Sequence, residues 1–322
     1  MIWLLPPLAL LAGLLLGAET LSPAEAWSVL RDPGQPLAQL IWQWRMPRVL
    51  AAGCVGALLA LGGVVFQGVF RNPLAEPYLL GSAGGAAMGA TVALLVALPV
   101  PSSLALPALA FAGAWGATWL VLALARLAGP ASIAALLLAG VAVAAVLGAM
   151  RSFLMLALSD ETVSLQAVLS WALGGVQTPA WPQLALLAGL TGAALLLCLT
   201  LARGLDLLGL GEAVAESFGL EVRRFVALAV LAGAFVVAVS VVWGGLVGFV
   251  GLMAPHLARW QVGALHAPLM PRAAAIGAAL AMLCDGAARA VLPPAEIPLS
   301  LVTALIGAPF FLLILAREAR RR

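Results

Sequence analysis

The run VGALLALGGVVFQGVF, Val55–Phe70, decides the fold class of this chain. It is apolar almost without interruption, whereas the strands of a membrane β-barrel alternate between apolar and polar residues with a period of two. Continuous apolar runs of about 17–25 residues are typical of helices that cross a bilayer. The run therefore predicts a membrane-spanning helix and argues against a barrel.

The composition of the whole chain agrees with this interpretation. Of its 322 residues, 64% are hydrophobic and 9% are charged, whereas a soluble domain has about 45–50% apolar and about 25% charged residues. No compact fold in water could bury this much apolar surface, so we expect an all-α polytopic membrane protein. Cys54, Cys198 and Cys284 lie inside apolar runs without metal-ligand spacing, which indicates core residues and no disulfide framework.

Ten apolar runs predict about ten transmembrane helices in a single domain, residues 1–322. The runs are Ile2–Leu16, Val49–Phe70, Leu79–Leu98, Leu104–Leu124, Ile133–Leu158, Leu184–Leu201, Phe225–Trp243, Leu246–Val262, Ala273–Val291 and Leu299–Leu315. The first run could also be a signal peptide. Because it lacks a basic leader and many spans follow, we interpret it as the first span.

The placement of arginine predicts the orientation in the membrane, since cytoplasmic loops collect positive charge. With both termini in the cytoplasm, eleven arginines fall inside, and only Arg31, Arg45, Arg48 and Arg289 fall outside. Two polar segments then lie between spans. Residues 159–181 form an outer-surface segment with a short amphipathic helix, and residues 204–222 form a cytoplasmic segment.

The cytoplasmic segment contains GLGEAVAESFGLEVRR, Gly209–Arg224, which carries three glutamates and two arginines. Its acidic residues lie near the start of a short predicted helix, where the helix dipole favours them. Gly219 is typical of the residue that ends such a helix. From the residues alone, this helix is either a contact surface for a cytoplasmic partner or a solvated connection between spans.

Four stretches together resemble one family of membrane proteins. They are RMPRVLAAGCVGALLALGGVVFQGVFRNPLAEPYLLG (Arg45–Gly81), GEAVAESFGLEVRR (Gly211–Arg224), GLVGFVGLMAPHLAR (Gly245–Arg259) and PAEIPLSLVTALIGAPFFLLIL (Pro294–Leu315). In this order they resemble the FecCD family of ABC-importer permeases, the membrane subunits that import iron–siderophore complexes, haem or cobalamin. The first span matches the family only in character.

The resemblance implies the partners of the chain. In this family the cytoplasmic segment docks on a separate ATPase subunit, and the matching positions here are Glu212, Ala213, Ala215, Glu216 and Gly219. The chain has no lysine, so it cannot form a Walker A site and another chain must bind ATP. The resemblance also implies two ATPase copies, a second permease copy that forms a homodimer, and an extracytoplasmic substrate-binding protein.

Arg45 and Arg48 are three residues apart on the outer side, and Arg289 lies near the outer end of the ninth run. In the family, arginines at these positions contact glutamates of the binding protein, so the resemblance implies a docking patch. Bidentate arginine–carboxylate pairs would supply both strength and orientation. The alternative is that the three arginines anchor lipid headgroups.

Arg151 and Ser152 lie in the fifth run, which lines the translocation path in the family. An arginine inside the membrane is costly and normally faces a cavity or a partner, so this pair could favour an anionic substrate. Alternatively, Arg151 reaches the outer interface or pairs with Asp160 or Glu161. In the third run, Ser82, Gly84 and Gly85 are candidate gate residues, although small residues at this spacing more often serve close helix packing.

Other polar residues predict local structure. We expect Gln67, Arg71, Asn72 and Glu76 to form a local hydrogen-bonded turn, and Asp285 to pair with Arg289 one helical turn later. His256 is interpreted as a structural residue rather than a metal ligand. The similarity of PLAEP (Pro73–Pro77) to PAEIP (Pro294–Pro298) is attributed to chance.

The sequence thus predicts a multi-pass permease of the bacterial or archaeal cytoplasmic membrane that takes up a chelated metal cofactor and catalyses no reaction itself. We expect no cofactor or metal of its own and no nucleic-acid partner. The alternative function is an ion-coupled secondary transporter that uses Arg151 and Asp285 as mid-membrane charges. An intramembrane enzyme is disfavoured because no pair of catalytic residues lies inside the spans.

Overall fold

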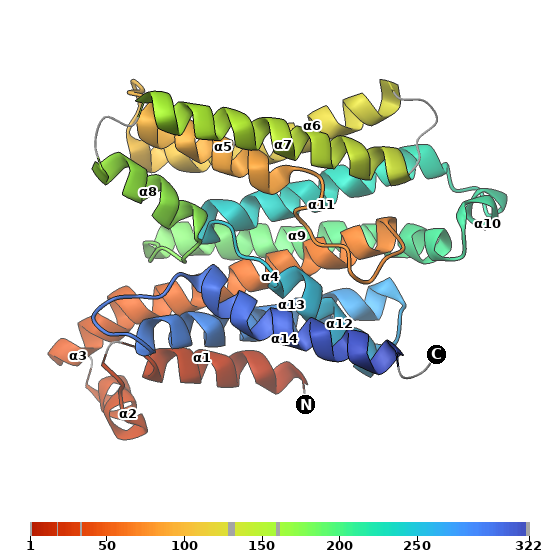
Figure 1. The fold of residues 1–322 in the computed structure, drawn as a ribbon. Coiled ribbons are helices and arrows are strands. Elements are labelled where there is room, and N and C mark those ends of the chain that lie inside the picture. Colours follow the sequence, from red (N-terminus) through yellow and green to blue (C-terminus); the bar gives the residue numbers. More distant parts are fainter. Residues whose placement is uncertain (1, 18, 33, 128–132, 159–161, 320–322) are drawn as a thin grey trace.

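The structure is a computed structural model that describes residues 2–17, 19–32, 34–127, 133–158 and 162–319. In these ranges the chain is helical without β-strands, and its long helices lie side by side as a bundle (Figure 1). The all-α prediction is therefore confirmed.

Each of the ten predicted apolar runs contains a helix. These helices are α1 (Leu5–Leu15), α4 (Met46–Val69), α5 (Ser82–Leu95), α6 (Ser102–Leu127), α7 (Ile133–Leu158), α9 (Trp181–Gly209), α11 (Val222–Gly244), α12 (Val250–Val262), α13 (His266–Ala290) and α14 (Leu299–Ala319). Short helices connect them: η1 (Ile2–Leu4), α2 (Pro23–Arg31), α3 (Pro36–Gln39), η2 (Leu40–Arg45), α8 (Thr162–Ala172) and α10 (Glu212–Ser217). The predicted helix of the outer segment corresponds to α8.

Among the described residues, six helices are long and apolar enough to cross a bilayer, namely those that contain α4, α6, α7, α9, α11 and α13. Three further apolar helices, Ile2–Leu15, Ser82–Leu95 and Leu299–Ile314, are shorter, and α12 has 13 residues. The third and eighth runs were predicted too long because their first residues belong to irregular segments, which precede Ser82 and Val250.

Helix α4 is the centre of the bundle, and nearly all of its residues are buried. It packs against α9, α11, α12 and α13. The contact with α13 is close because a Cβ atom at Gly56 would overlap the carbonyl oxygen of Gly277. Small residues at such a crossing let two helix backbones approach, which is the main source of helix association in lipid.

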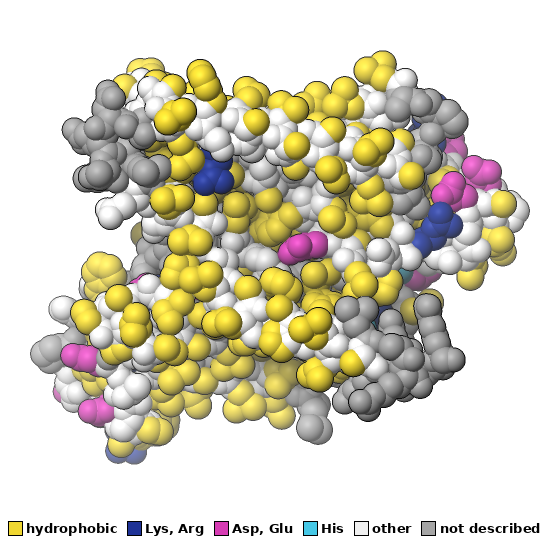
Figure 2. All heavy atoms as spheres, viewed as in Figure 1, with side chains coloured by type: hydrophobic (Ala, Val, Ile, Leu, Met, Phe, Trp, Pro, Cys, Tyr) yellow, Lys and Arg dark blue, Asp and Glu magenta, His cyan; other side chains and the backbone are white. Residues whose placement is uncertain are grey.

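The two ends of the bundle carry most of the polar connections. Helix α10 and the end of α14 lie at one end, and α2, α3 and α8 lie at the other (Figure 1). On the face drawn in Figure 2, hydrophobic side chains cover the middle, and charged side chains gather mainly towards these two ends. The functional candidates divide between the same two ends, called here the α10 end and the α8 end.

Candidate functional site

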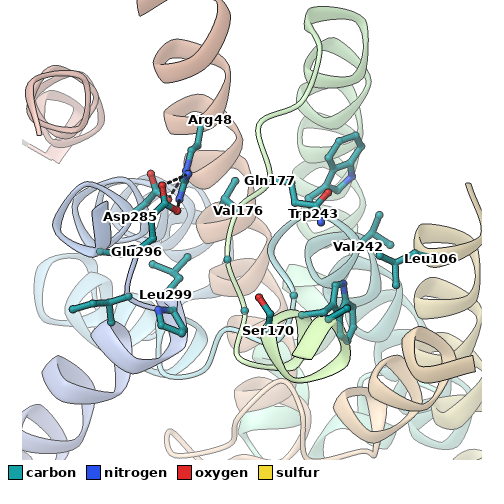
Figure 3. Close-up of a pocket in the computed structure, with 18 of the residues that line it drawn as sticks. Arg48, Leu106, Ser170, Val176, Gln177, Val242, Trp243, Asp285, Glu296 and Leu299 are labelled. Carbon is teal, nitrogen blue, oxygen red and sulfur yellow. Dashed lines mark hydrogen bonds and ion pairs between the residues drawn. The ribbon is translucent and has the colours of Figure 1, made fainter. Parts of the chain in front are cut away.

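A cleft of about 390 Å³ lies at the α8 end of the bundle. On one side it is lined by the charged residues Arg48, Asp285 and Glu296, and Ser170, Gln177 and Trp243 lie across from them (Figure 3). The charged side combines α4, α13 and the segment before α14, which are far apart in the sequence.

Arg48 is the centre of the charged side. Its Nε donates to Asp285 Oδ1 at 3.1 Å, and its two terminal nitrogens donate to the carboxylate oxygens of Glu296 at 3.0 and 2.8 Å. Asp285 Oδ2 also accepts from Arg289 Nε at 3.0 Å, which confirms the predicted pair. Asp285 is buried and is compensated by two arginines, as a buried charge requires.

The other two predicted docking arginines bind the end of α1. Arg45 donates to the carbonyl oxygens of Leu14 and Glu19, and Arg289 donates to those of Gly13 and Leu16. Helix C-termini leave carbonyl oxygens without helical partners and carry partial negative charge. The two guanidinium groups donate hydrogen bonds to these carbonyl oxygens and supply positive charge beside them. Arg45 and Arg289 are each only 6% exposed.

These contacts bear on the predicted docking patch without testing it. In this structure the guanidinium groups of Arg45 and Arg289 are directed into the chain rather than towards headgroups or a partner, while Arg48 keeps an exposed side. Sequence reasoning identified the three arginines but missed Glu296. An acid in a proline-rich segment at the predicted outer end was the available signal.

At the opposite end, α10 lies between two glycines with positive φ, Gly211 at 109° and Gly219 at 85°. The Leu220 N–H donates to the Ala215 carbonyl and the Gly219 N–H to that of Glu216, which forms a Schellman motif with glycine in its usual position. The predicted role of Gly219 in ending the helix is thereby confirmed.

The exposed side of α10 is partly apolar. Leu210, directly after α9, is 64% exposed, and Val214 and Phe218 are 40% and 69% exposed. The spacing of four residues places Val214 and Phe218, which directly follows α10, near one side of this helical turn. Of the predicted coupling residues, Ala215 is buried, whereas Ala213 and Glu216 are exposed. Glu212 forms an ion pair with Arg71 at 2.9 Å.

The polar residues at the end of α4 and just after it form the predicted local turn through their backbone, and several of their side chains also make distant contacts. Gln67 accepts from Arg259 of α12, and Arg71 binds Glu212 of α10. Locally, the Asn72 N–H donates to the Gln67 carbonyl, and the Asn72 side chain accepts from the Leu74 N–H. The predicted turn is therefore present in the backbone, but spacing along one helix end cannot reveal which distant elements its side chains contact.

The segment from Arg71 to Gly81 is anchored to the segment before α12. Glu76 Oε1 accepts from the Phe249 N–H at 3.4 Å, and the Tyr78 hydroxyl accepts from the Val247 N–H at 3.3 Å. Burial raises the pKa of Glu76, although the hydrogen bond from Phe249 partly opposes this shift. Two segments without regular structure thus support each other inside the bundle.

The two predicted path residues of α7, Arg151 and Ser152, differ in their exposure. In the described part of the chain, Arg151 Nε is buried and makes no hydrogen bond, while Ser152 is exposed. The alternative partners Asp160 and Glu161 lie outside the described residues.

The gate candidates of α5 differ in their surroundings. Ser82 is buried and donates to the Pro77 carbonyl. A Cβ at Gly85 would overlap the Gly113 carbonyl oxygen of α6, whereas Gly84 has ordinary spacing. Gly85 therefore serves close packing of α5 on α6.

Sequence reasoning also missed a pair at the α10 end. His266 Nδ1 lies 2.6 Å from Asp206 Oδ1, and the same oxygen accepts from the His266 N–H at 2.9 Å. His256 packs against the rings of Trp260 and Phe310. Over the described ranges, no group of three or more His, Cys, Asp or Glu residues could hold a metal.

Comparisons with known proteins agree with this architecture. The model of the FecCD transport family matches residues 5–317. The chain is 36% identical over 311 residues to the hemin transport system permease protein HmuU of Yersinia pestis, covering 95% of this chain and 91% of the relative. It is 37% identical over 313 residues to the vitamin B12 import system permease protein BtuC of Escherichia coli, covering 97% and 93%.

A solved structure described as an inward-facing, metal-chelate type ABC transporter has a TM-score of 0.83 and 33% sequence identity to this chain, covering 98% of this chain and 97% of that one. The apolar helices and the relatives together define a permease of an ABC importer. The chain belongs to the FecCD transport family. It is a multi-pass protein of the cytoplasmic membrane, and its family supplies transport subunits rather than enzymes.

Proposed function

We propose that this chain is the membrane-spanning subunit of an ATP-driven importer that takes up a chelated metal cofactor, such as haem, cobalamin or an iron–siderophore complex. The substrate class is supported by the relatives, which are named for hemin and vitamin B12. A substrate-binding protein would deliver the substrate at the α8 end. The end of α14, which lies at the α10 end (Figure 1), would then be cytoplasmic.

The observation that carries the proposal is the shape of the α10 segment. It projects from the end of the bundle between two glycines with positive φ and exposes Leu210, Val214 and Phe218. Apolar side chains that remain exposed outside the bilayer mark a contact surface. Since the chain has no lysine for a phosphate-binding loop, a separate ATPase subunit is the partner that fits this surface. Glu212, Ala213, Ala215, Glu216 and Gly219 would form or support the contact.

At the α8 end, the binding protein would meet the cleft around Arg48. This arginine is 17% exposed and lies beside the 52% exposed Glu296, so an acidic side chain of a partner could reach it. Arg45 and Arg289 would support the patch from below by fixing the end of α1. Docking thus depends on Arg48 most directly.

A second copy of the chain would complete the translocation path. Helix α7 has 6% of its most apolar window buried, and α14 exposes Leu305 and Leu312. These faces suit either lipid or another permease, and the family supports a dimer with the substrate passing between the copies. Arg151 and Ser152 on α7 would then lie at or near the path and favour an anionic substrate.

The test is purification of the chain from its own membrane in mild detergent, followed by identification of the proteins that accompany it. Recovery of a Walker A ATPase in equal amount, with ATP-dependent uptake after reconstitution, is the expected outcome. Uptake driven by a proton gradient without an ATPase would instead support the secondary transporter. That alternative is weakened by Asp285, whose two oxygens already bind Arg48 and Arg289.

A further inference from the structure

The end of α4 departs from a common rule of helix termination. The Arg71 N–H donates to the Gly68 carbonyl and the Asn72 N–H to that of Gln67, which is the hydrogen-bond pattern of a Schellman motif. The residue at the left-handed position of this motif is usually glycine. Here it is Arg71, with φ at 51°.

An arginine in this position is strained, since its Cβ crowds the following carbonyl oxygen in the left-handed region, which glycine avoids. Gly219 holds the equivalent position in α10, where φ is 85°. The left-handed position is therefore occupied by the favourable glycine after α10 and by an unfavourable arginine after α4. A local rule that is broken without local benefit points to a function of the side chain.

The Arg71 side chain joins two elements that are 141 residues apart in the sequence. Its Nη2 lies 2.9 Å from Glu212 Oε1, at the first residue of α10. The backbone of Arg71 begins the irregular segment 71–81, so the ion pair connects α10 to the start of that segment.

The same segment is bound near its middle to a second strained residue. Glu76 accepts from the N–H of Phe249, which has φ at 68° and is, with Arg71, one of two described non-glycine residues with positive φ. Phe249 packs against α14, where a Cβ at Gly307 would overlap its ring. Segment 71–81 thus lies between α10 and the contact of Phe249 with α14.

We propose that Arg71 is a positioning residue for transport: its ion pair with Glu212 passes the displacement of α10 to segment 71–81 and, through Glu76, to Phe249. The role in transport rests on the proposed function, whereas the mechanical link is a property of this chain alone. Arg71 and Phe249, at the two ends of this chain of contacts, are both held in strained backbone conformations. A displacement of α10 would let these residues relax and change the position of segment 71–81.

The link is tested first on the full chain alone in lipid nanodiscs, by hydrogen–deuterium exchange of segment 72–81. The variants are Glu212→Gln, Arg71→Gly and the two combined. The matched control is Arg224→Gln, which removes an exposed ion pair with Glu221 near the same end. Glu212→Gln is expected to raise exchange in segment 72–81 about two- to fivefold, the size expected of an exposed ion pair.

The combined variant is expected to add nothing to the stronger single variant, because both remove the same interaction. The control is expected to leave segment 72–81 unchanged. If Glu212→Gln changes exchange in α10 only, or if the control acts equally, the link is overturned. Neither result depends on an ATPase partner, so it is separate from the outcome of the purification test.

The second measurement uses the complex with the co-purified ATPase. Arg71→Gly removes the side chain and fits the backbone, so ATPase recovery and thermal stability are expected to stay at the level of the unaltered chain. Substrate transported per ATP hydrolysed is expected to fall about tenfold or more. A merely structural residue would lower stability and leave this ratio unchanged, and that result would overturn the role in transport.

Discussion

Arg48 and Glu296 are joined on the charged side of the cleft at the α8 end by two hydrogen bonds of 3.0 and 2.8 Å, so the terminal nitrogens of Arg48 already bind a carboxylate of their own chain. An acidic partner that docks on Arg48 must compete with Glu296 or displace it. Since Glu296 is half exposed and its segment precedes α14, displacement would change the connection to a helix that packs against α12 and α13.

We therefore expect Glu296→Gln to strengthen binding of the substrate-binding protein, by up to about fivefold for an exposed ion pair. The measurement is the dissociation constant of the binding protein for the complex in nanodiscs at low and high salt. Glu25→Gln is the matched control, since it removes an acid from the same end and glutamine preserves the capping box of α2. Weaker binding in Glu296→Gln would contradict docking on Arg48.

Asp285→Ala is expected to destabilise the fold strongly. It leaves the guanidinium groups of Arg48 and the buried Arg289 without their shared carboxylate, and removing one partner of a buried ion pair costs about 3–5 kcal/mol. Unfolding can be followed in detergent with a thiol-reactive dye, because Cys198 and Cys284 are buried free thiols. Glu296→Ala is the control, for which a loss below about 1 kcal/mol is expected. Equal losses in the two variants would disprove the central role of Asp285.

The membrane class, the helical runs and the Asp285–Arg289 pair could be predicted because they follow from local composition and spacing. The contacts of Arg71, Glu76 and Glu296 could not, since they join elements that only the packed bundle brings together. The similarity of PLAEP and PAEIP was attributed to chance. In the structure, each segment contains a glutamate, Glu76 or Glu296, that binds a distant part of the chain. A glutamate between closely spaced prolines can therefore indicate a long-range contact.

Gly85→Ala tests whether the GSAGG stretch serves packing or gating. The added Cβ would overlap the Gly113 carbonyl oxygen, which belongs to backbone and cannot rotate away, so we expect a loss of about 1–3 kcal/mol in stability. Gly116→Ala on α6 is the control, because no atom lies within 4 Å of the new Cβ. Thermal unfolding in detergent gives both values. Lost transport with unchanged stability in Gly85→Ala would favour the gate instead.

The apolar side of α10 yields the last prediction. Leu210 and Phe218 are 64% and 69% exposed, and a docked ATPase would bury them, so the variant with both residues replaced by serine should lose most of its ATPase. We expect ATPase recovery to fall at least about tenfold, since two buried apolar side chains contribute about 1.5–3 kcal/mol each. Stability should be unchanged, because neither side chain is buried in the isolated chain. Leu292→Ser, which alters a 60% exposed leucine at the α8 end, is the control that should keep its ATPase. If the α10 variant retained the ATPase as well as this control does, the partner would have to bind another surface, and α10 would return to being a solvated connection between α9 and α11.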